Sequence, residues 1–154
     1  MDFNLNNEKS FPLPAGWLSK KLGEICRVVG GSTPNTGDQA FWDGGIVWIT
    51  PTDLGKLESP WIESSQRRIT EMGYRSCGTE MLPKGTVVLS SRAPIGHLGI
   101  AAVTLCTNQG CKSFVPGENV DSYYLYWCLR YFVPDLQRLG SGATFDPLPI
   151  LWTV

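Results

Sequence analysis

The chain has 154 residues, of which 42% are hydrophobic and 18% are charged, and its formal net charge is −1. This length and apolar content predict a single domain with a hydrophobic core. No apolar run approaches the roughly 18 residues of a membrane span, and residues 1–8 lack the basic and apolar regions of a secretory signal, so we expect a cytoplasmic protein.

The chain is expected to begin with a polar tail, followed by two short strands. Residues 1–12 are polar and are predicted to be a frayed tail. Trp17 is the expected core anchor. The residue pattern predicts strands near 17–22 and 27–29, with one turn of helix between them at 22–25.

Polar loops follow the next two strands. The glycine-rich loop 30–34 matches neither nucleotide-binding glycine motif, so it gives no support for nucleotide binding. The apolar run 46–49 predicts a strand buried on both faces, which leads into the polar residues 50–54. In that segment Thr52 or Asp53 caps a following turn or contacts a ligand; the pattern leaves both open.

Two apolar strands form the predicted centre of the domain. Thr70 is the expected N-cap of a short helix that ends before Gly78. Residues 86–91 and 99–105 are β-branched and apolar, and each run leads into a polar loop. Those loops either form a recognition surface on a rigid support or only cap the ends of their strands.

A strand and a longer helix complete the predicted elements. Residues 111–115 are expected to form the strand. Asp121 can cap a helix with apolar residues at three- and four-residue spacing, which stops at Gly140. Pro134 is expected to kink or split this helix. Its many aromatic side chains favour packing over base stacking, because stacking platforms usually lie on exposed sheets.

Neither metal binding nor catalysis has a clear pattern in the sequence. The chain has five cysteines, an odd number, and we interpret them as reduced thiols. No two of them have zinc-ligand spacing, and His97 is the only histidine in the sequence, so a structural zinc site is not expected. His97 with Ser90, Ser91, Cys106 or Cys111 would form a nucleophile and base, yet no local signature surrounds them. A binding module is therefore favoured over an enzyme.

The basic residues are unevenly distributed along the chain. Between residues 64 and 117 six lysines and arginines stand against two acidic residues, whereas the rest of the chain holds seven basic and twelve acidic residues. The positive segment coincides with the two central strands and their loops. This distribution modestly supports a polyanionic partner.

Eight motifs in chain order carry a resemblance to one family. They are Trp17 with Leu22-Gly23-Glu24-Ile25, Gly31-Ser32-Thr33-Pro34, Ile46-Val47-Trp48-Ile49-Thr50-Pro51-Thr52-Asp53-Leu54, Ile69-Thr70-Glu71-Met72-Gly73, Leu82-Pro83-Lys84-Gly85-Thr86-Val87, Ser90-Ser91-Arg92-Ala93-Pro94-Ile95-Gly96, Thr107-Asn108-Gln109-Gly110 with Lys112, and Gly140-Ser141-Gly142-Ala143-Thr144-Phe145. The chain resembles a target recognition domain of the type I restriction-modification DNA specificity subunit, HsdS.

The resemblance implies a mixed α/β (α+β) domain over residues 13–145, with a twisted, mostly buried sheet, short flanking helices and one longer C-terminal helix. It also implies that the domain reads one half of a split double-stranded DNA target and performs no chemistry. A methyltransferase subunit (HsdM) would use S-adenosylmethionine, and a translocase-nuclease subunit (HsdR) would use ATP and Mg²⁺. Residues 146–154 would be a truncated start of the conserved helical region, which leaves an apolar surface open to self-association.

The expected DNA-contacting residues fall into two groups. Residues in the shared motifs are expected to contact phosphates or place loops: Ser32, Thr33, Thr50, Thr52, Lys84, Ser90, Ser91, Arg92, Asn108, Gln109 and Lys112. Residues outside those motifs are expected to read bases: Gln39, Lys56, Gln66, Arg67 and Arg68. The alternatives are a small nucleic-acid-processing enzyme, another ligand-binding domain built on these loops, or an interaction module using the aromatic helix.

Overall fold

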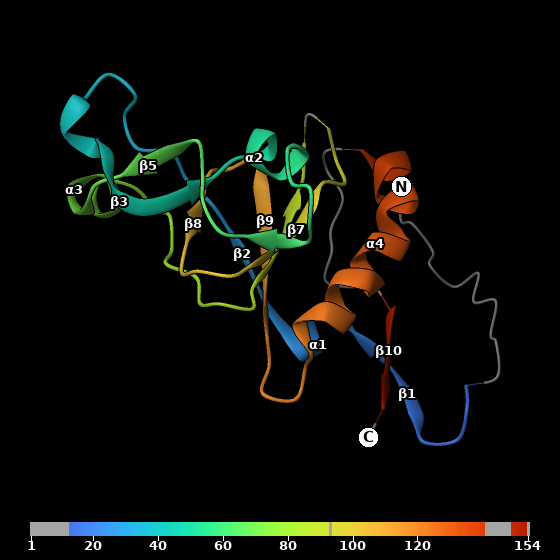
Figure 1. The fold of residues 1–154 in the computed structure, drawn as a ribbon. Helices are drawn as coiled ribbons and strands as arrows, with labels where there is room; N and C mark the ends of the chain where they lie inside the picture. The colour runs from blue at the N-terminus through green and yellow to red at the C-terminus, as the bar shows by residue number, and fades with distance from the viewer. Residues whose placement is uncertain (1–12, 93, 141–148, 154) are drawn as a thin grey trace.

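A computed structural model describes residues 13–92, 94–140 and 149–153 of the chain. The described strands form three sheets, and one long helix lies against the largest of them (Figure 1). The predicted mixed α/β class is confirmed. The sequence suggested one sheet, however, whereas the strands divide into groups of five, three and two.

The five-stranded sheet is the centre of the domain. In spatial order it contains β2 (Cys26–Gly30), β9 (Cys111–Pro116), β6 (Val87–Ser90), β7 (Leu98–Ala101) and β4 (Trp61–Ile62). All neighbours are antiparallel except β4 and β7, which run parallel. Every residue of β6 and β7 is buried, as the continuous apolar character of these runs predicts.

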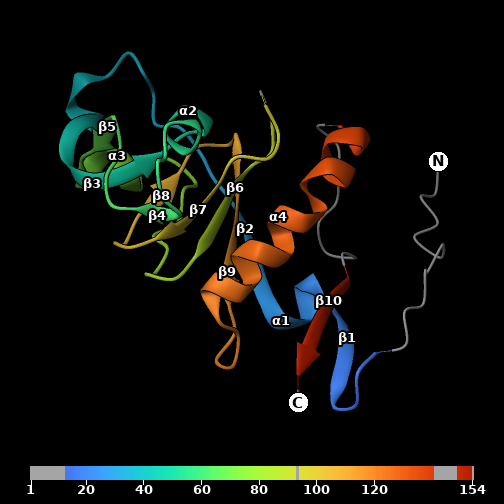
Figure 2. The same ribbon diagram turned by 45° about the vertical axis from the view of Figure 1, so that its right-hand side comes forward.

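Helix α4 (Ser122–Leu139) covers one face of this sheet, as Figures 1 and 2 show. Leu125, Leu129 and Leu136 share a buried cluster with Val87 and Leu89 of β6. The predicted ends are confirmed: Asp121 accepts a hydrogen bond from the backbone amide of Tyr124, and Gly140 ends the helix with φ 76°. Pro134 lies inside the helix and does not split it.

The other face of the five-stranded sheet contributes to a second core. Val88 points away from Val87 and Leu89 and packs in a cluster with Ile49 and Leu54. This cluster joins the large sheet to the three-stranded sheet, which contains β5 (Arg67–Ile69), β3 (Trp42–Ile49) and β8 (Cys106–Thr107) in that order. Both faces of strand β6 are therefore covered, which accounts for its apolar run Val87-Val88-Leu89.

Four short helical turns connect the strands. They are α1 (Leu22–Ile25), the 3₁₀ turn η1 (Gln39–Phe41), α2 (Pro51–Gly55) and α3 (Glu71–Arg75). The predictions for α1 and α3 are confirmed, and the Thr70 hydroxyl caps α3 by accepting from the backbone amide of Gly73 at 3.0 Å. The N-cap of α2 is Thr50, rather than Thr52 or Asp53.

The third sheet pairs the first and last strands of the chain. Strand β1 (Trp17–Lys21) runs antiparallel to β10 (Pro149–Thr153). Residues 149–153 are thus extended, whereas we expected the start of a helical region. Pro149 lacks a backbone donor and fits the first position of a strand. The tail 1–12, residues 141–145 of the last shared motif, and residues 146–148 and 154 lie outside the described part of the chain.

Two further expectations concern the core and the membrane. Trp17 is half-buried and belongs to none of the described core clusters, so its prediction as a core anchor is wrong. It lies on β1, in the small two-stranded sheet. Among the described residues, no helix has the length and apolar character needed to cross a membrane.

Candidate nucleic-acid interface

The predicted polar loops gather at one edge of the structure because of the strand pairing. Gly30 at the end of β2 pairs with Lys112 at the start of β9, and Ser90 at the end of β6 pairs with Cys111. Strands β3 and β8 are parallel, so both end at this edge, and the amide of Asn108 donates to the carbonyl of Ile49 at 2.9 Å. We call this the loop edge; α2 lies beside it (Figure 1).

The glycine-rich loop lies directly on the loop that follows β8. The amide of Ser32 donates to the carbonyl of Thr107 at 3.0 Å, and the hydroxyl of Thr33 donates to the side-chain oxygen of Gln109. A Cβ atom on Gly31 would lie 2.1 Å from the carbonyl oxygen of Asn108. Glycine is therefore required here by close contact between two backbones.

The loop after β8 is shaped by its own side chains. The amide oxygen of Asn108 accepts from the backbone amide of Gly110 at 2.9 Å, which is the turn-forming role that the alternative interpretation assigned to it. Gln109 is exposed, and its side-chain oxygen accepts from Thr33. Gln109 therefore faces solvent, while Asn108 mainly forms the turn.

Helix α2 is held by a reciprocal cap that also reaches a second loop. The carboxylate of Asp53 accepts from the backbone amide of Thr50 at 2.9 Å and from its hydroxyl at 2.6 Å. Its other oxygen accepts from the backbone amide of Gln66 at 2.8 Å. The side chain of Lys56 donates to the amide oxygen of Gln66 at 3.4 Å. Lys56 and Gln66, both predicted base readers, thus lie together, and Thr52 is exposed on the same helix.

The end of β6 holds a buried serine, and the loop after it holds an exposed cation. The hydroxyl of Ser90 donates to the carbonyl of Pro94 at 2.7 Å and accepts from the amides of Gly96 and His97. Because Ser90 is fully buried, it is limited to loop placement and does not reach a phosphate. Ser91 is half-buried and donates to the carbonyl of Gly110 at 3.1 Å.

Two cations of the loop edge have no acidic partner among the described residues. Arg92 is exposed and Lys112 is half-buried, and no ion pair within residues 13–92, 94–140 and 149–153 includes either of them. The Nζ atom of Lys112 lies 3.7 Å from the position that a Cβ on Gly30 would take. These are the groups on this edge best suited to contact an anionic partner.

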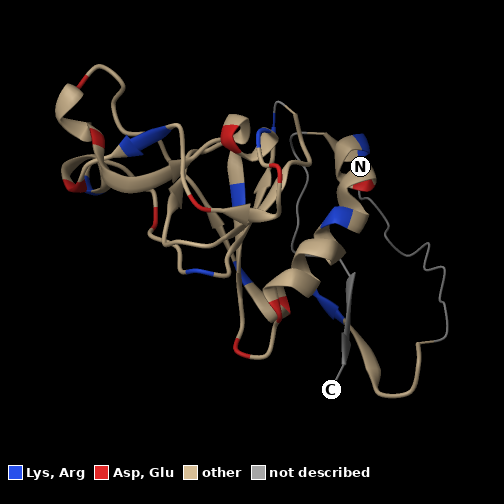
Figure 3. Ribbon diagram, in the orientation of Figure 1, with Lys and Arg blue, Asp and Glu red and all other residues tan. Residues whose placement is uncertain are grey.

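The remaining predicted residues lie outside the loops of this edge, although Arg67 pairs with Trp48 beside the end of β3. Lys84 precedes β6 and therefore lies at the opposite end of that strand from Ser90 and Arg92. Arg67 and Arg68 belong to β5 in the three-stranded sheet, where basic residues are visible at the left of Figure 3. Arg68 donates to the carbonyl of Gly45 at 3.3 Å, and Gln39 is exposed on η1.

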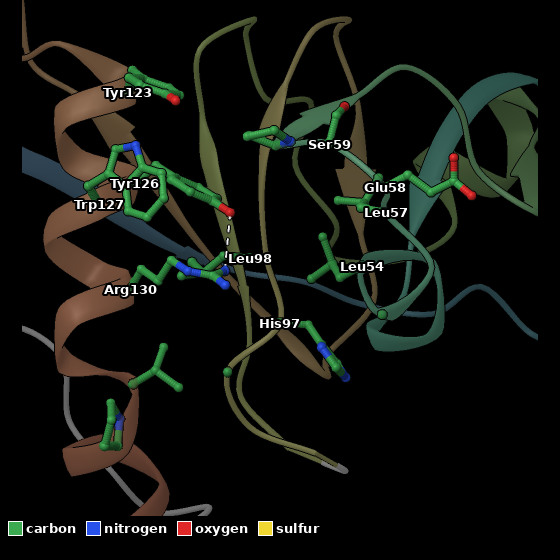
Figure 4. Close-up of a pocket in the computed structure, with 15 residues that line it drawn as sticks. Leu54, Leu57, Glu58, Ser59, His97, Leu98, Tyr123, Tyr126, Trp127 and Arg130 are labelled. Carbon is green, nitrogen blue, oxygen red and sulfur yellow. Dashed lines mark hydrogen bonds between the residues drawn. The ribbon is translucent and has the colours of Figure 1, made fainter.

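A groove lies between α4 and residues 54–60 (Figure 4). It has a volume of about 730 Å³ and is lined on one side by Tyr126, Trp127 and Arg130 and on the other by Leu54 and Leu57. Arg130 donates to the hydroxyl of Tyr126 at 3.3 Å. No pattern in the sequence predicted this groove, because its walls come from segments that are far apart in the chain.

The groups considered for catalysis are engaged in packing. Ser90 is bonded to the backbone of His97 rather than to its imidazole. Burial raises the pKa of the Cys106 thiol and of the Cys111 thiol to about 12, so both stay protonated near neutral pH and are poor nucleophiles. In the described part of the chain, no cluster of three or more His, Cys, Asp or Glu could hold a metal ion.

Sequence reasoning missed the link between Asp53 and Gln66. Asp53 follows Thr50 at capping-box spacing, so the reciprocal cap had a signal in the sequence. The bond from Gln66 to the second carboxylate oxygen joins residues thirteen positions apart and had no such signal.

Comparison with known proteins identifies the family of the chain. Residues 14–148 match the family model described as "Type I restriction modification DNA specificity domain". The chain is 41% identical over 138 residues to the type I restriction enzyme MjaIX specificity subunit of Methanocaldococcus jannaschii, which covers 88% of this chain and 32% of that protein. It is 32% identical over 137 residues to the EcoR124I/EcoR124II specificity subunit of Escherichia coli, covering 82% of this chain and 33% of that protein.

Solved structures show the same fold. The chain superposes on the HsdS subunit of Thermoanaerobacter tengcongensis with a TM-score of 0.73 and 23% identity, over 96% of this chain and 36% of that one. A structure of a type I restriction-modification assembly gives a TM-score of 0.76 at 22% identity, over 95% of this chain and 36% of that one. The chain spans about a third of the length of the curated relatives it matches.

Proposed function

The chain belongs to the type I restriction modification DNA specificity domain family, and from this membership we propose that it recognises a double-stranded DNA sequence for a type I restriction-modification system. The observation that carries the proposal is the convergence of the polar loops after β2, β3, β6 and β8 on one edge, with Arg92 and Lys112 beside them. Such an edge offers donors and cations to a polyanion on a rigid support.

The two groups of predicted residues have different proposed roles, one in phosphate contact and loop placement and the other in base reading. Arg92 and Lys112 contact phosphates, and Ser32, Thr33, Thr50, Thr52, Ser91, Asn108 and Gln109 place or extend the loops around them. Lys56, Gln66, Arg67, Arg68 and Gln39 are the proposed base readers, because their long polar side chains lie outside the motifs that the family resemblance rests on. Lys84 stands apart from both groups, at the opposite end of β6.

In this proposal the chain is not an enzyme. It reads one half of a split target and directs a methyltransferase subunit and a translocase-nuclease subunit, which hold S-adenosylmethionine, ATP and Mg²⁺. The names of the relatives as specificity subunits support this role. Since DNA and these partners are found inside the cell, the cytoplasm is the proposed location.

The test is a titration of the purified chain with duplex DNA at two salt concentrations, followed by selection from duplexes with randomised base pairs. Binding through phosphates weakens steeply with salt, whereas binding of a small molecule in a pocket does not. The expected result is salt-sensitive binding with a preferred sequence. Binding that is insensitive to salt, or that shows no preferred sequence, would reject the proposal, and methyl transfer by the chain alone would reject its non-enzymatic part.

A further inference from the structure

Asp53 is engaged on both sides by groups from two different segments. One carboxylate oxygen accepts two hydrogen bonds from Thr50, and the other accepts the backbone amide of Gln66. All three donor–acceptor distances are between 2.6 and 2.9 Å, within the range of strong hydrogen bonds to a charged acceptor. Asp53 therefore fastens the loop before β5 to the first turn of α2.

This link sets the position of two predicted base readers. Lys56 is the C-cap of α2, and its backbone amide donates to the carbonyl of Asp53 at 3.1 Å. Gln66 is anchored through its own backbone amide to the carboxylate of Asp53. The next anchor of that loop is Ser65, whose hydroxyl accepts from the amide of Trp48 at 3.1 Å. The two readers thus share one attachment point.

The side chains of these readers present hydrogen-bond donors to solvent. Lys56 donates one of its protons to the amide oxygen of Gln66, which leaves its other protons and the amide nitrogen of Gln66 available. A glutamine reads adenine by using its oxygen as an acceptor and its nitrogen as a donor, but here Lys56 engages the oxygen. Guanine offers two acceptors, N7 and O6, in the major groove.

We propose that Asp53 is a positioning residue that holds Lys56 and Gln66 as one donor-presenting unit, and that this unit selects guanine. The inference rests on the proposed function, because it needs DNA at the loop edge. Phosphate oxygens are also acceptors, so the same unit would bind the DNA backbone if it did not reach a base. Contact with a base and contact with the backbone can be distinguished, because only loss of a base contact alters the sequence preference.

The experiment is selection by the full chain from duplexes with randomised base pairs, with Asp53→Asn as the main variant. Asparagine has the same shape but only one acceptor oxygen, so it cannot serve Thr50 and Gln66 together. Asp121→Asn is the matched control, because it makes the same charge change at the cap of α4, away from this unit. Circular dichroism establishes that each variant is folded.

The wild-type chain and the control are expected to select guanine at one position, and Asp53→Asn is expected to reduce that preference about tenfold at that position alone. Lys56→Met frees the amide oxygen of Gln66 and is expected to move the preference toward adenine. If Asp53→Asn does not fold, the shift in base preference of Lys56→Met is the test of the inference.

Three results would overturn the inference. If folded Asp53→Asn and Lys56→Met kept the base preference of the wild-type chain, Asp53 would not be a positioning residue. A uniform loss of affinity for all duplexes would place the unit on phosphates. A wild-type chain without any sequence preference would instead reject the proposed function itself.

Discussion

The guanidinium of Arg67 lies over the indole ring of Trp42, with its central carbon 3.5 Å from the ring centroid. Trp42 is buried and meets Trp48 edge-on, so the aromatic platform under Arg67 is itself fixed. A guanidinium held over an aromatic ring is restricted in its orientation, and its fixed fork of donors suits bidentate reading of guanine.

We therefore predict that Arg67→Lys reduces sequence discrimination about tenfold while keeping the net charge, because an ammonium neither stacks as well nor forms the paired bonds. Selection from randomised duplexes measures this change. Arg75→Lys, on the exposed face of α3, is the matched control and is expected to keep the wild-type profile. If both variants selected the same sequences as the wild-type chain, Arg67 would not be a base-reading residue.

Gly31→Ala is predicted to destabilise the fold by about 1 to 3 kcal/mol, since its methyl group would overlap the backbone of Thr107 and Asn108. Urea unfolding measures the loss. Gly45→Ala is the control, because a Cβ at Gly45 meets no atom within 4 Å. If Gly31→Ala lowered the free energy of unfolding no more than the control does, the loop at Gly31 and the loop at Asn108 would be free to move apart.

Arg92→Ala and Lys112→Ala are each predicted to weaken binding to all duplexes alike and to reduce the salt slope by about one. The reason is that each substitution removes one cation that has no acidic partner in the described residues. Binding isotherms at several salt concentrations provide the measurement. Arg138→Ala, at the last turn of α4, should leave the slope unchanged, and a loss confined to one sequence would make Arg92 or Lys112 a base reader.

The buried thiols predict a fall in stability at high pH. Burial is the first cause that raises the pKa of Cys106 and of Cys111 to about 12, from an ordinary value of 9.0. Above pH 9 the unfolded chain releases these protons while the folded chain retains them. The free energy of unfolding should therefore be unaffected by these thiols below pH 9 and decline by about 1.4 kcal/mol per pH unit for each thiol above it.

Urea unfolding between pH 7 and 11 checks this decline. Cys106→Ala and Cys111→Ala should each flatten it. Equal slopes in the two variants and the wild-type chain would mean that other groups cause the decline.

Self-association through α4 stays a prediction. Tyr123, Trp127 and Tyr131 are 47%, 49% and 78% exposed, and they lie on the same helix. Tyr131→Glu is expected to lower the fraction of dimer in sedimentation experiments over a range of concentrations. Thr36→Glu adds the same charge in an exposed turn and should not change it. A wild-type chain that stays monomeric would reject the prediction.

Local patterns predicted the elements whose residues interact with close neighbours in sequence. The spacing of Leu125, Leu129 and Leu136, together with Asp121 and Gly140, predicted α4 nearly to its ends. The apolar run 86–91 predicted a buried strand, and β6 is buried because both of its faces are covered. Helix caps and the spacing of apolar residues involve positions only a few residues apart, so a short stretch of sequence is enough to reveal them.

Relationships between distant segments were not predictable in the same way. The pairing of Lys20 with Ile150, and the bond from Gln66 to Asp53, depend on the path of the whole chain. Lys84 was grouped with Arg92 because both belong to motifs shared with the family, yet strand β6 separates them in space. Composition and spacing contain no information on which end of a strand faces a ligand.

The pairing of β1 with β10 also has a consequence for how such a unit can be inherited. Trp17 lies opposite Thr153, so the polypeptide enters and leaves the domain at neighbouring points. A module with adjacent entry and exit can be inserted into a longer chain or exchanged for a homologue with little disturbance to the flanking polypeptide. Recombination at these two strands would replace the whole proposed DNA-reading surface in one genetic event.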